Sequence, residues 1–248
     1  MIKVMKYLLV LVLGLSLVGC GTSGKGEKVY TIATDKTYAP FEMTNDKGKL
    51  IGIDMELIRA IAKNQKFKIQ INSLGFDAAC TALESGEADG VIAGMTINDE
   101  RKKKYDFSTP YYKTGVSLGV AKDSSIKGYN DLKGKTVVAK TSTAGLAFAQ
   151  SIKNKYGFKL EVVEESSLMF EKVKSHEAAA CFEDTPVLKY MIKTGELNFN
   201  IPTPSANPSF YGFAVSKGMN GELLKKFNKG LENLKKDGTY DKILHKYE

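Results

Sequence analysis

The sequence contains no tryptophan and only two histidines, His176 and His245, among its 248 residues. Neither histidine sits in a Ser/His/Asp arrangement or in a pattern of zinc ligands, which argues against a hydrolytic triad and a zinc centre. After residue 20 the sequence has no run of about 18 apolar residues, the length that a membrane-spanning helix needs. It also has no repeat at a fixed period, which argues against a solenoid.

The one long apolar run lies at the start of the chain. It covers Tyr7–Val18, follows two lysines, and has the size of a signal-peptide core. The run ends in LVGC, which is similar to the box that precedes the lipidated cysteine of bacterial lipoproteins. We therefore predict a signal peptide over 1–19, lipidation at Cys20 and a flexible tether over 20–28. The alternative is an ordinary secretory signal with a chance cysteine.

Cysteine is scarce as well. Cys80 and Cys181 show neither metal-ligand spacing nor a CxxC pair. An exported protein meets an oxidising environment in which a disulfide can form. However, both cysteines lie in apolar segments, DAAC and AAAC, where a free cysteine behaves as a small buried hydrophobic residue. We predict two buried thiols.

The chain is basic, with 36 lysines and arginines against 28 acids. A basic surface favours anionic envelope polymers or an acidic docking partner. The basic runs, such as Arg101–Lys104 and Lys235-Lys236, are not interleaved with aromatic residues as in a surface that stacks on nucleic acid. We interpret them as solvated helix faces and predict no nucleic-acid partner.

Strand and helix patterns alternate through the mature chain. Apolar or alternating runs predict strands at 29–34, 68–72, 88–95, 136–139 and 178–182. Helical spacing of apolar residues predicts helices at 54–62, 78–83, 143–156, 166–174, 185–193, 223–234 and 240–247. Asp54 is expected to be the N-cap of the first helix. This alternation predicts an α/β fold with open, mostly parallel sheets.

The strand and helix units form two blocks. We predict a first lobe over 29–110 and a second over 116–206, with hinge crossings at 111–115 and 207–211. The tail, 212–248, is expected to return to the first lobe. In open α/β sheets, ligands bind beyond the carboxyl ends of the strands. Two sheets whose carboxyl ends face each other would therefore form a binding cleft.

Charges of both signs stand at the ends of the predicted strands in both blocks. They are Asp35, Arg101, Lys140, Glu183 and Asp184. A free α-amino acid suits such a set, because its carboxylate needs a fixed cation and its ammonium needs a carboxylate. Each of these residues alone can be explained by an ordinary structural role, and Arg101 by itself would be interpreted as a surface arginine. The prediction depends on their occurring together.

Six motifs give the sequence a resemblance to a known family. They are TDKTYAPFEM at 34–43, GKLIGIDMELIRAIA at 48–62, GEADGVIAGMTINDERKKKYDFSTPYY at 86–112, DLKGKTVVAKTSTAG at 131–145, CFEDTPVLKYMI at 181–192 and DGTYDKILHKY at 237–247. The sequence resembles the polar amino acid substrate-binding proteins of ABC importers, which are type II periplasmic binding proteins. It is most similar to the glutamine-binding members.

The resemblance implies a two-lobed α/β fold with two hinge crossings and a binding function without catalysis. The implied partners are an amino acid, an ABC permease and its ATPase. No cofactor or metal is implied, and the protein is expected to be a monomer. The lipid at Cys20 would hold it on the outer face of the cytoplasmic membrane, or on the periplasmic side.

The resemblance also implies a role for each residue that contacts the ligand backbone. Arg101 would bind the ligand carboxylate, helped by the backbone N–H groups of Thr96 and Ala144. Asp184 would bind the ligand ammonium, with Gly94 and Thr96 assisting.

Further roles concern the ligand side chain. Phe41 and Phe76 would enclose its aliphatic part, and Asp35 and Lys140 would meet a side-chain amide, which favours glutamine. The expected lining is completed by Met95, Thr143 and Glu183.

Two departures from the family pattern keep alternatives open. Ser142-Thr143-Ala144 stands where the family often has Gly-Thr-Gly, and Glu183 stands where glutamine-binding members have histidine. A second acid beside Asp184 would favour arginine, histidine or a cystine-like ligand. Two other functions also remain possible on the same fold. One is a prearomatic-acid dehydratase that uses Glu183 or His176 as general acid or base. The other is a sensor or adhesin.

Overall fold

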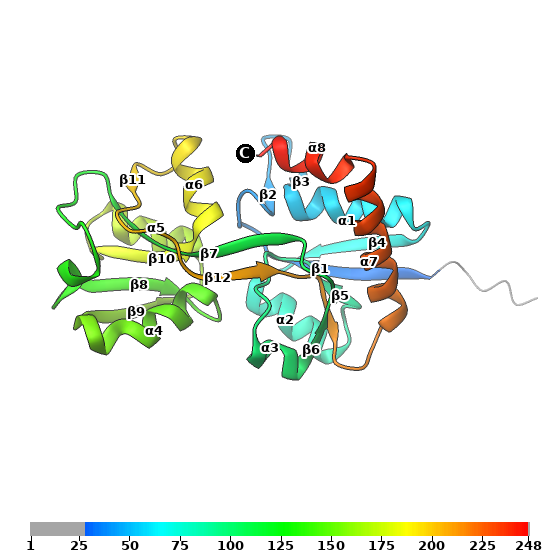
Figure 1. The fold of residues 1–248 in the computed structure, drawn as a ribbon, viewed down its shortest axis with the longest axis horizontal. Helices are drawn as coiled ribbons and strands as arrows, with labels where there is room; N and C mark the ends of the chain where they lie inside the picture. Colours follow the sequence, from blue (N-terminus) through cyan, green and yellow to red (C-terminus); the bar gives the residue numbers. More distant parts are fainter. Residues whose placement is uncertain (1–27, 248) are drawn as a thin grey trace, which may run out of the picture.

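The computed structural model describes residues 28–247, so the predicted signal peptide and Cys20 lie outside the described residues. The molecule has two lobes arranged along its longest axis and joined by neighbouring strands (Figure 1). Within residues 28–247, no helix combines the length and the apolar character needed to cross a membrane.

The first lobe, lobe 1, is built around a five-stranded sheet in the order β4-β1-β5-β13-β6. Its strands are β1 (Val29–Thr34), β4 (Lys68–Ser73), β5 (Gly90–Val91), β6 (Tyr105–Phe107) and β13 (Ala214–Ser216). Its helices are α1 (Ile53–Asn64), α2 (Phe76–Ser85), α3 (Asp99–Lys104), α7 (Gly221–Lys236) and α8 (Thr239–His245), and a small hairpin joins β2 (Met43–Thr44) to β3 (Leu50–Ile51). The apolar faces of α1 and α7 pack in one core, and that of α2 packs in another.

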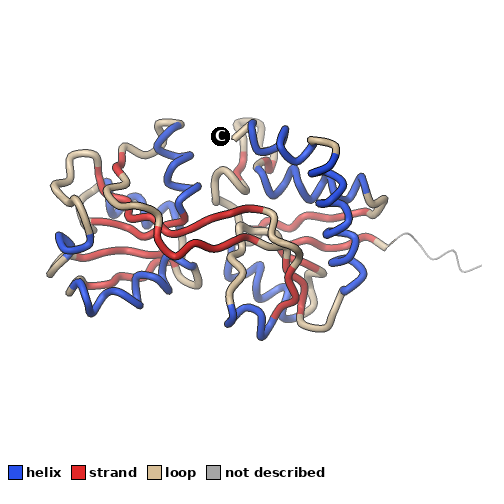
Figure 2. Tube along the Cα trace, viewed as in Figure 1, coloured by secondary structure: helices blue, strands red, loops and turns tan. Residues whose placement is uncertain are grey.

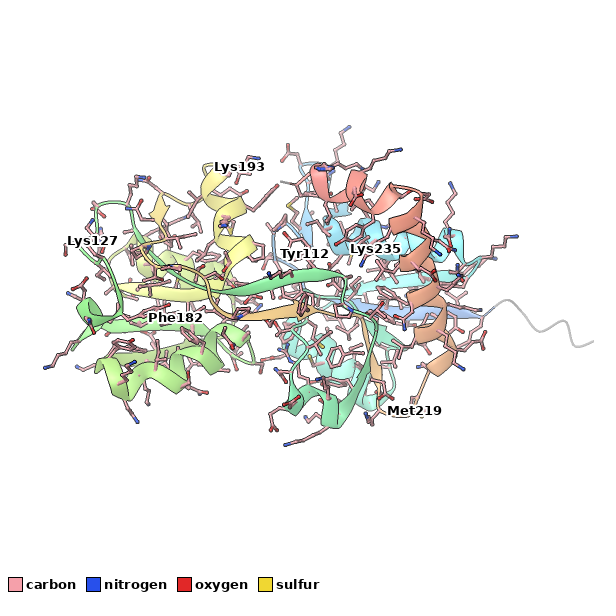
Figure 3. The ribbon with its side chains drawn as sticks, viewed as in Figure 1. Tyr112, Lys127, Phe182, Lys193, Met219 and Lys235 are labelled. Carbon is pink, nitrogen blue, oxygen red and sulfur yellow. The ribbon has the colours of Figure 1, made fainter. Side chains whose placement is uncertain are left out.

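The second lobe, lobe 2, has its sheet in the order β11-β7-β10-β8-β9. Its strands are β7 (Tyr112–Ala121), β8 (Thr136–Lys140), β9 (Lys159–Val163), β10 (Ala180–Asp184), β11 (Phe199–Asn200) and β12 (Ala206–Tyr211). Its helices are α4 (Ala144–Tyr156), α5 (Ser166–Lys174), α6 (Thr185–Lys193) and the 3-10 turn η1 (Tyr129–Leu132). Phe182 lies inside this lobe (Figure 3), with its ring edge-on to Phe148 of α4.

Strands β7 and β12 run side by side between the lobes (Figure 2). They pair antiparallel, with Tyr112 opposite Tyr211. After β12 the chain returns to lobe 1, where α7 and α8 pack in the same core as α1. The chain therefore passes between the lobes at two adjacent places.

Both sheets are mixed rather than mostly parallel. The pairs β1–β4, β1–β5, β8–β9 and β8–β10 are parallel, as the alternating pattern predicts. The antiparallel pairs involve β7, β12 and β13, which belong to the crossing and returning segments. These strands lie in a sheet next to strands far away in the sequence, so their direction depends on the topology and not on the local pattern.

Two local predictions are corrected. Asp54 is not the cap of α1, because Gly52 occupies that position with a φ of 126°. A Cβ at residue 52 would lie 2.2 Å from the Phe41 carbonyl oxygen, so only glycine fits there. The apolar run 88–95 forms only the two-residue strand Gly90–Val91, and Gly94, with a φ of 51°, turns the chain beyond it.

Candidate functional site

A cavity lies between the two lobes. Its lining comes from the ends of strands and the starts of helices in both lobes. The lining residues are Asp35, Tyr38, Phe76, Ala93, Gly94, Thr96, Arg101, Lys140, Thr143, Ala144 and Asp184. The cavity therefore lies beyond the carboxyl ends of β1, β8 and β10, where open α/β sheets bind ligands.

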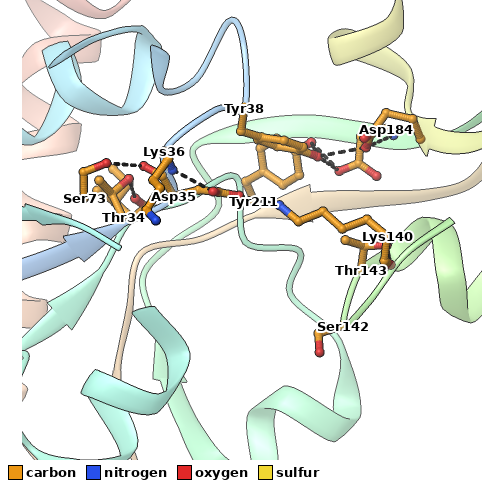
Figure 4. A network of polar contacts seen from close by, with 12 residues as sticks. Thr34, Asp35, Lys36, Tyr38, Ser73, Lys140, Ser142, Thr143, Asp184 and Tyr211 are labelled. Carbon is orange, nitrogen blue, oxygen red and sulfur yellow. Dashed lines mark hydrogen bonds and ion pairs between the residues drawn. The ribbon is translucent and has the colours of Figure 1, made fainter. Parts of the chain in front are cut away.

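A buried ion pair crosses the cavity from one lobe to the other. Lys140, at the end of β8, places its Nζ 2.7 Å from Oδ2 of Asp35, which follows β1 (Figure 4). The two side chains are only 4% and 2% exposed. Burial acts to lower the pKa of Lys140, but the Asp35 carboxylate outweighs it and holds the pKa above its ordinary value. Lys140 is therefore a fixed cation and Asp35 its counter-ion.

Asp184, at the end of β10, is the second buried carboxylate of the cavity. Its Oδ2 accepts hydrogen bonds from the hydroxyl of Tyr38, at 2.8 Å, and from the hydroxyl of Tyr211 (Figure 4). Burial raises the pKa of Asp184, while the two hydroxyls and Arg101 oppose that rise. Because Tyr38 belongs to lobe 1 and Asp184 to lobe 2, this contact also joins the lobes.

Arg101 is the second cation of the cavity, and its backbone belongs to the short helix α3. The Asn98 side chain caps that helix by accepting the Arg101 N–H at 2.8 Å. The guanidinium donates from Nη1 to the Thr96 carbonyl and from Nη2 to the Ser142 carbonyl, each at 2.8 Å. It also lies over the Phe76 ring, 5.1 Å from the centroid. These contacts hold the planar guanidinium group of Arg101 at the edge of the cavity.

The start of α4 supplies backbone N–H groups on the lobe 2 side. Thr143 caps the helix, since its hydroxyl accepts the Leu146 N–H at 3.2 Å and donates to the Lys140 carbonyl at 2.7 Å. Ser142 adopts the left-handed conformation, with a φ of 58°, and Ala144 begins the helix. The helix start attracts anions, because its first N–H groups lack intrahelical acceptors.

The structure corrects the placement of Phe41, which does not line the cavity. Phe41 and Tyr38 belong to one tight turn, in which the Phe41 N–H donates to the Tyr38 carbonyl at 2.8 Å, and their ring centroids lie 5.9 Å apart. Phe41 is fully buried and packs edge-on against Tyr112 and Tyr211, whereas Tyr38 forms the cavity wall together with Phe76. Both aromatics stand in one short motif, so the sequence alone did not distinguish the wall residue from the core residue.

Met95 and Glu183 also lie behind the cavity and not in its lining. The Met95 side chain is fully buried in the core beside α2. Glu183 accepts the Asp184 N–H at 2.7 Å through Oε1, while its Oε2 has no hydrogen-bond partner. Burial, with a contribution from Asp184, raises the pKa of Glu183 to about 8. This carboxyl group is therefore largely protonated at neutral pH.

The charges in the cavity balance. Asp35 and Asp184 are acidic, and Lys140 and Arg101 are basic, with one member of each sign in each lobe. A carboxylate or an ammonium of a ligand thus finds an opposite charge, whereas a ligand with a net charge would unbalance the site. The arrangement suits a zwitterion with a neutral side chain.

Comparison with known proteins agrees with this geometry. Residues 30–248 match the sequence model of the bacterial extracellular solute-binding proteins, family 3. The arginine-binding extracellular protein ArtP of Bacillus subtilis is 34% identical, over 98% of this chain and 97% of that protein.

Solved structures with the same two-lobed fold are also similar. Substrate-binding domain 2 of Lactococcus lactis GlnP, in an open conformation, is 43% identical with a TM-score of 0.64, and the match covers 90% of this chain and 96% of that one. An ancestral arginine-binding protein bound to glutamine is 39% identical with a TM-score of 0.80, covering 88% and 97%. The higher score to the ligand-bound structure agrees with the contacts that close the lobes here.

Proposed function

We propose that this chain, which belongs to family 3 of the bacterial extracellular solute-binding proteins, binds one neutral polar amino acid between its lobes. L-Glutamine is the first candidate. The observation that carries this choice is the buried ion pair between Asp35 and Lys140 in the cavity lining.

Each charged end of the ligand would meet groups from both lobes. The guanidinium of Arg101 and the N–H groups at the start of α4 suit the carboxylate. The Asp184 carboxylate, with the Gly94 carbonyl and the Thr96 hydroxyl, suits the ammonium. Tyr38 and Phe76 supply an apolar wall for the aliphatic part of the side chain.

The ion pair suits a side-chain amide, because an amide offers both an acceptor and two donors. Lys140 would donate to the amide oxygen, and Asp35 would accept from the amide nitrogen. A guanidinium or ammonium side chain would instead bring a further positive charge beside Lys140. Because the pKa of Glu183 is raised to about 8, that residue supplies little compensating negative charge at neutral pH.

The two crossing strands, β7 and β12, suit a hinge function. The ligand would bind one lobe first and gain contacts with the other lobe on closing, and only those added contacts shift the equilibrium towards the closed form. A permease and its ATPase would then receive the amino acid from the closed protein. The lipid at Cys20 and the tether over 20–28 would keep a monomeric protein close to that transporter.

A thermal-shift screen against the twenty amino acids, cystine and ornithine tests the ligand. A ligand that binds only the folded state raises the melting temperature as its concentration exceeds the dissociation constant. We expect L-glutamine to give the largest shift. A larger shift with arginine or histidine would show that the ligand is a cationic amino acid and not glutamine. No shift with any amino acid would contradict the binding function.

The variant Lys140→Met tests the charge argument within the same screen. We expect weaker glutamine binding and a gain in arginine binding relative to glutamine, because Asp35 loses its counter-ion. Lys135→Met, in the exposed loop before the same strand, is the matched control and should behave as the unmodified protein. Unchanged selectivity in Lys140→Met would show that the ion pair takes no part in recognising the ligand side chain.

A further inference from the structure

Two buried carboxyl groups lie behind the cavity and take no part in the proposed contacts with the ligand. Glu42 and Asp54 are both fully buried. Burial and a hydrogen bond between the two side chains both contribute to the shifted pKa values of the two groups. Both carboxyl oxygens of Glu42, and Oδ1 of Asp54, have no other hydrogen-bond partner. Since two carboxylates offer only acceptors, they can bond to each other only if one of them carries a proton.

The remaining contacts identify which group holds the proton. Oδ2 of Asp54 accepts the Gly94 N–H at 2.7 Å and the Tyr111 hydroxyl at 2.8 Å. Burial raises the pKa of Asp54 to about 6, and the two donors oppose that rise by stabilising the charged carboxylate. Glu42 has no comparable donors, and burial raises its pKa well above the ordinary value. Asp54 is therefore the ionised member and Glu42 the protonated one.

The pair ties together three parts of lobe 1 that surround the ligand cavity. The Glu42 backbone pairs with Tyr38, and the Tyr38 N–H donates to the Glu42 carbonyl at 2.7 Å. The Asp54 side chain holds the Gly94 backbone, and a Cβ at Gly94 would lie 2.5 Å from the Tyr38 ring. Through Tyr111, Asp54 also holds the chain where it enters the crossing strand β7.

We propose that Glu42 and Asp54 share one proton and act as positioning residues that hold the Tyr38 wall and the Gly94 carbonyl in place for the ligand. The expected effect on ligand binding depends on the proposed function, whereas the shared proton does not depend on it. Neither residue touches the cavity, so the pair acts only through Tyr38, Gly94 and Tyr111.

The charged groups around the pair fix the direction of the pH effect. Asp35 disfavours a charge on Glu42, Lys140 favours one, and Tyr111 and the Gly94 N–H stabilise the Asp54 charge. With its pKa raised in the folded state, Glu42 keeps its proton there at pH values where the unfolded chain has lost it. Stability from this group is therefore complete below about pH 4.5, the ordinary pKa, and falls as the pH rises towards the raised value.

Urea unfolding without ligand, from pH 5 to about pH 9, tests the shared proton. The amide of Glu42→Gln donates to Asp54 without a titratable proton, so we expect a shallower loss of stability with rising pH than in the unmodified protein. Infrared absorption of protonated carboxyl groups at neutral pH should be smaller in the same variant. The control is Asp89→Asn. Asp89 is half-buried, and its carboxylate accepts the Thr31 N–H near the start of β1. This variant should leave the pH slope unchanged. Equal slopes and equal infrared bands for Glu42→Gln and the unmodified protein would overturn the proposal.

Calorimetric titration with L-glutamine at pH 7.5, above the raised pKa of Asp54, tests the positioning role. Asp54→Asn removes the charge that holds Gly94 and Tyr111, and we expect affinity to fall at least about tenfold. Glu42→Gln keeps the hydrogen bond, and its affinity should stay within about twofold. Equal losses in the two variants would overturn the positioning role. If the unmodified protein binds no glutamine, the proposed ligand is wrong, while the unfolding and infrared results still decide on the proton.

Discussion

At the scale of single residues, Arg101 is the group on which the proposed ligand recognition depends most. Its guanidinium is held by the carbonyls of Thr96 and Ser142, one from each lobe, so its position depends on both. A cation fixed in this way needs little rearrangement to accept a carboxylate, which favours tight binding.

Replacing Arg101 by alanine should therefore weaken amino acid binding strongly. Removal of one partner of a buried charge pair typically costs about 2–5 kcal/mol, so affinity measured by calorimetry should fall at least about 30-fold. Lys102→Ala is the matched control, because Lys102 lies next in the same helix and forms an exposed ion pair with Asp99. Equal affinity in Arg101→Ala and the control would show that Arg101 does not bind the ligand.

Residue-scale reasoning from the sequence found the charges that line the cavity but missed their buried support. Asp35, Lys140 and Asp184 were detectable because each polar residue directly follows or ends an apolar strand. An acid near a helix start is typical of a cap, so the local sequence favours a cap at Asp54, whose partners, Gly94 and Tyr111, are distant in sequence. The sequence does not distinguish Tyr38 from Phe41 as the wall residue, because both aromatics stand in one short motif.

At the scale of elements, helix α4 carries the N–H groups that face the cavity. Thr143 does two things there, since its hydroxyl caps the helix and also bonds to the carbonyl of Lys140. The close packing of α4 on β10 is set at Gly145, where a Cβ would lie 2.6 Å from the Phe182 carbonyl oxygen. The helix start is thereby held against the strand that ends in Asp184.

Thr143→Ala removes the cap, and we expect a loss of about 1 kcal/mol in unfolding free energy. Ligand affinity should fall as well, because the first turn of α4 frays beside the cavity. Urea unfolding and calorimetry measure the two effects. Thr143→Ser keeps the hydroxyl and should restore most of both; a serine variant as weak as the alanine variant would show that the methyl group matters instead of the cap.

Elements with strong local signals could be predicted from the sequence. Helices α5 and α6 occupy the predicted ranges, 166–174 and 185–193, because their apolar spacing is regular. Strand β5 could not be placed correctly, since the run 88–95 is apolar as a result of burial and not of strand pairing along its whole length. The antiparallel partners β7 and β13 meet strands from distant segments, which no local pattern encodes.

At the scale of the whole molecule, polar contacts across the cavity hold the lobes together. Among them are those that join Asp35 to Lys140, Tyr38 to Asp184, and Arg101 to the Ser142 carbonyl. In each case one partner is also a group proposed to bind the ligand. An amino acid in the cavity would therefore use the same charges that close the lobes, which couples binding to closure.

Small-angle X-ray scattering of the protein with and without L-glutamine tests this coupling most directly, with Arg101→Ala as the reference that cannot hold the ligand carboxylate. We expect glutamine to reduce the radius of gyration of the unmodified protein and to leave that of Arg101→Ala unchanged. A radius that stays the same in the unmodified protein while calorimetry shows glutamine bound would contradict closure of the two lobes around the ligand.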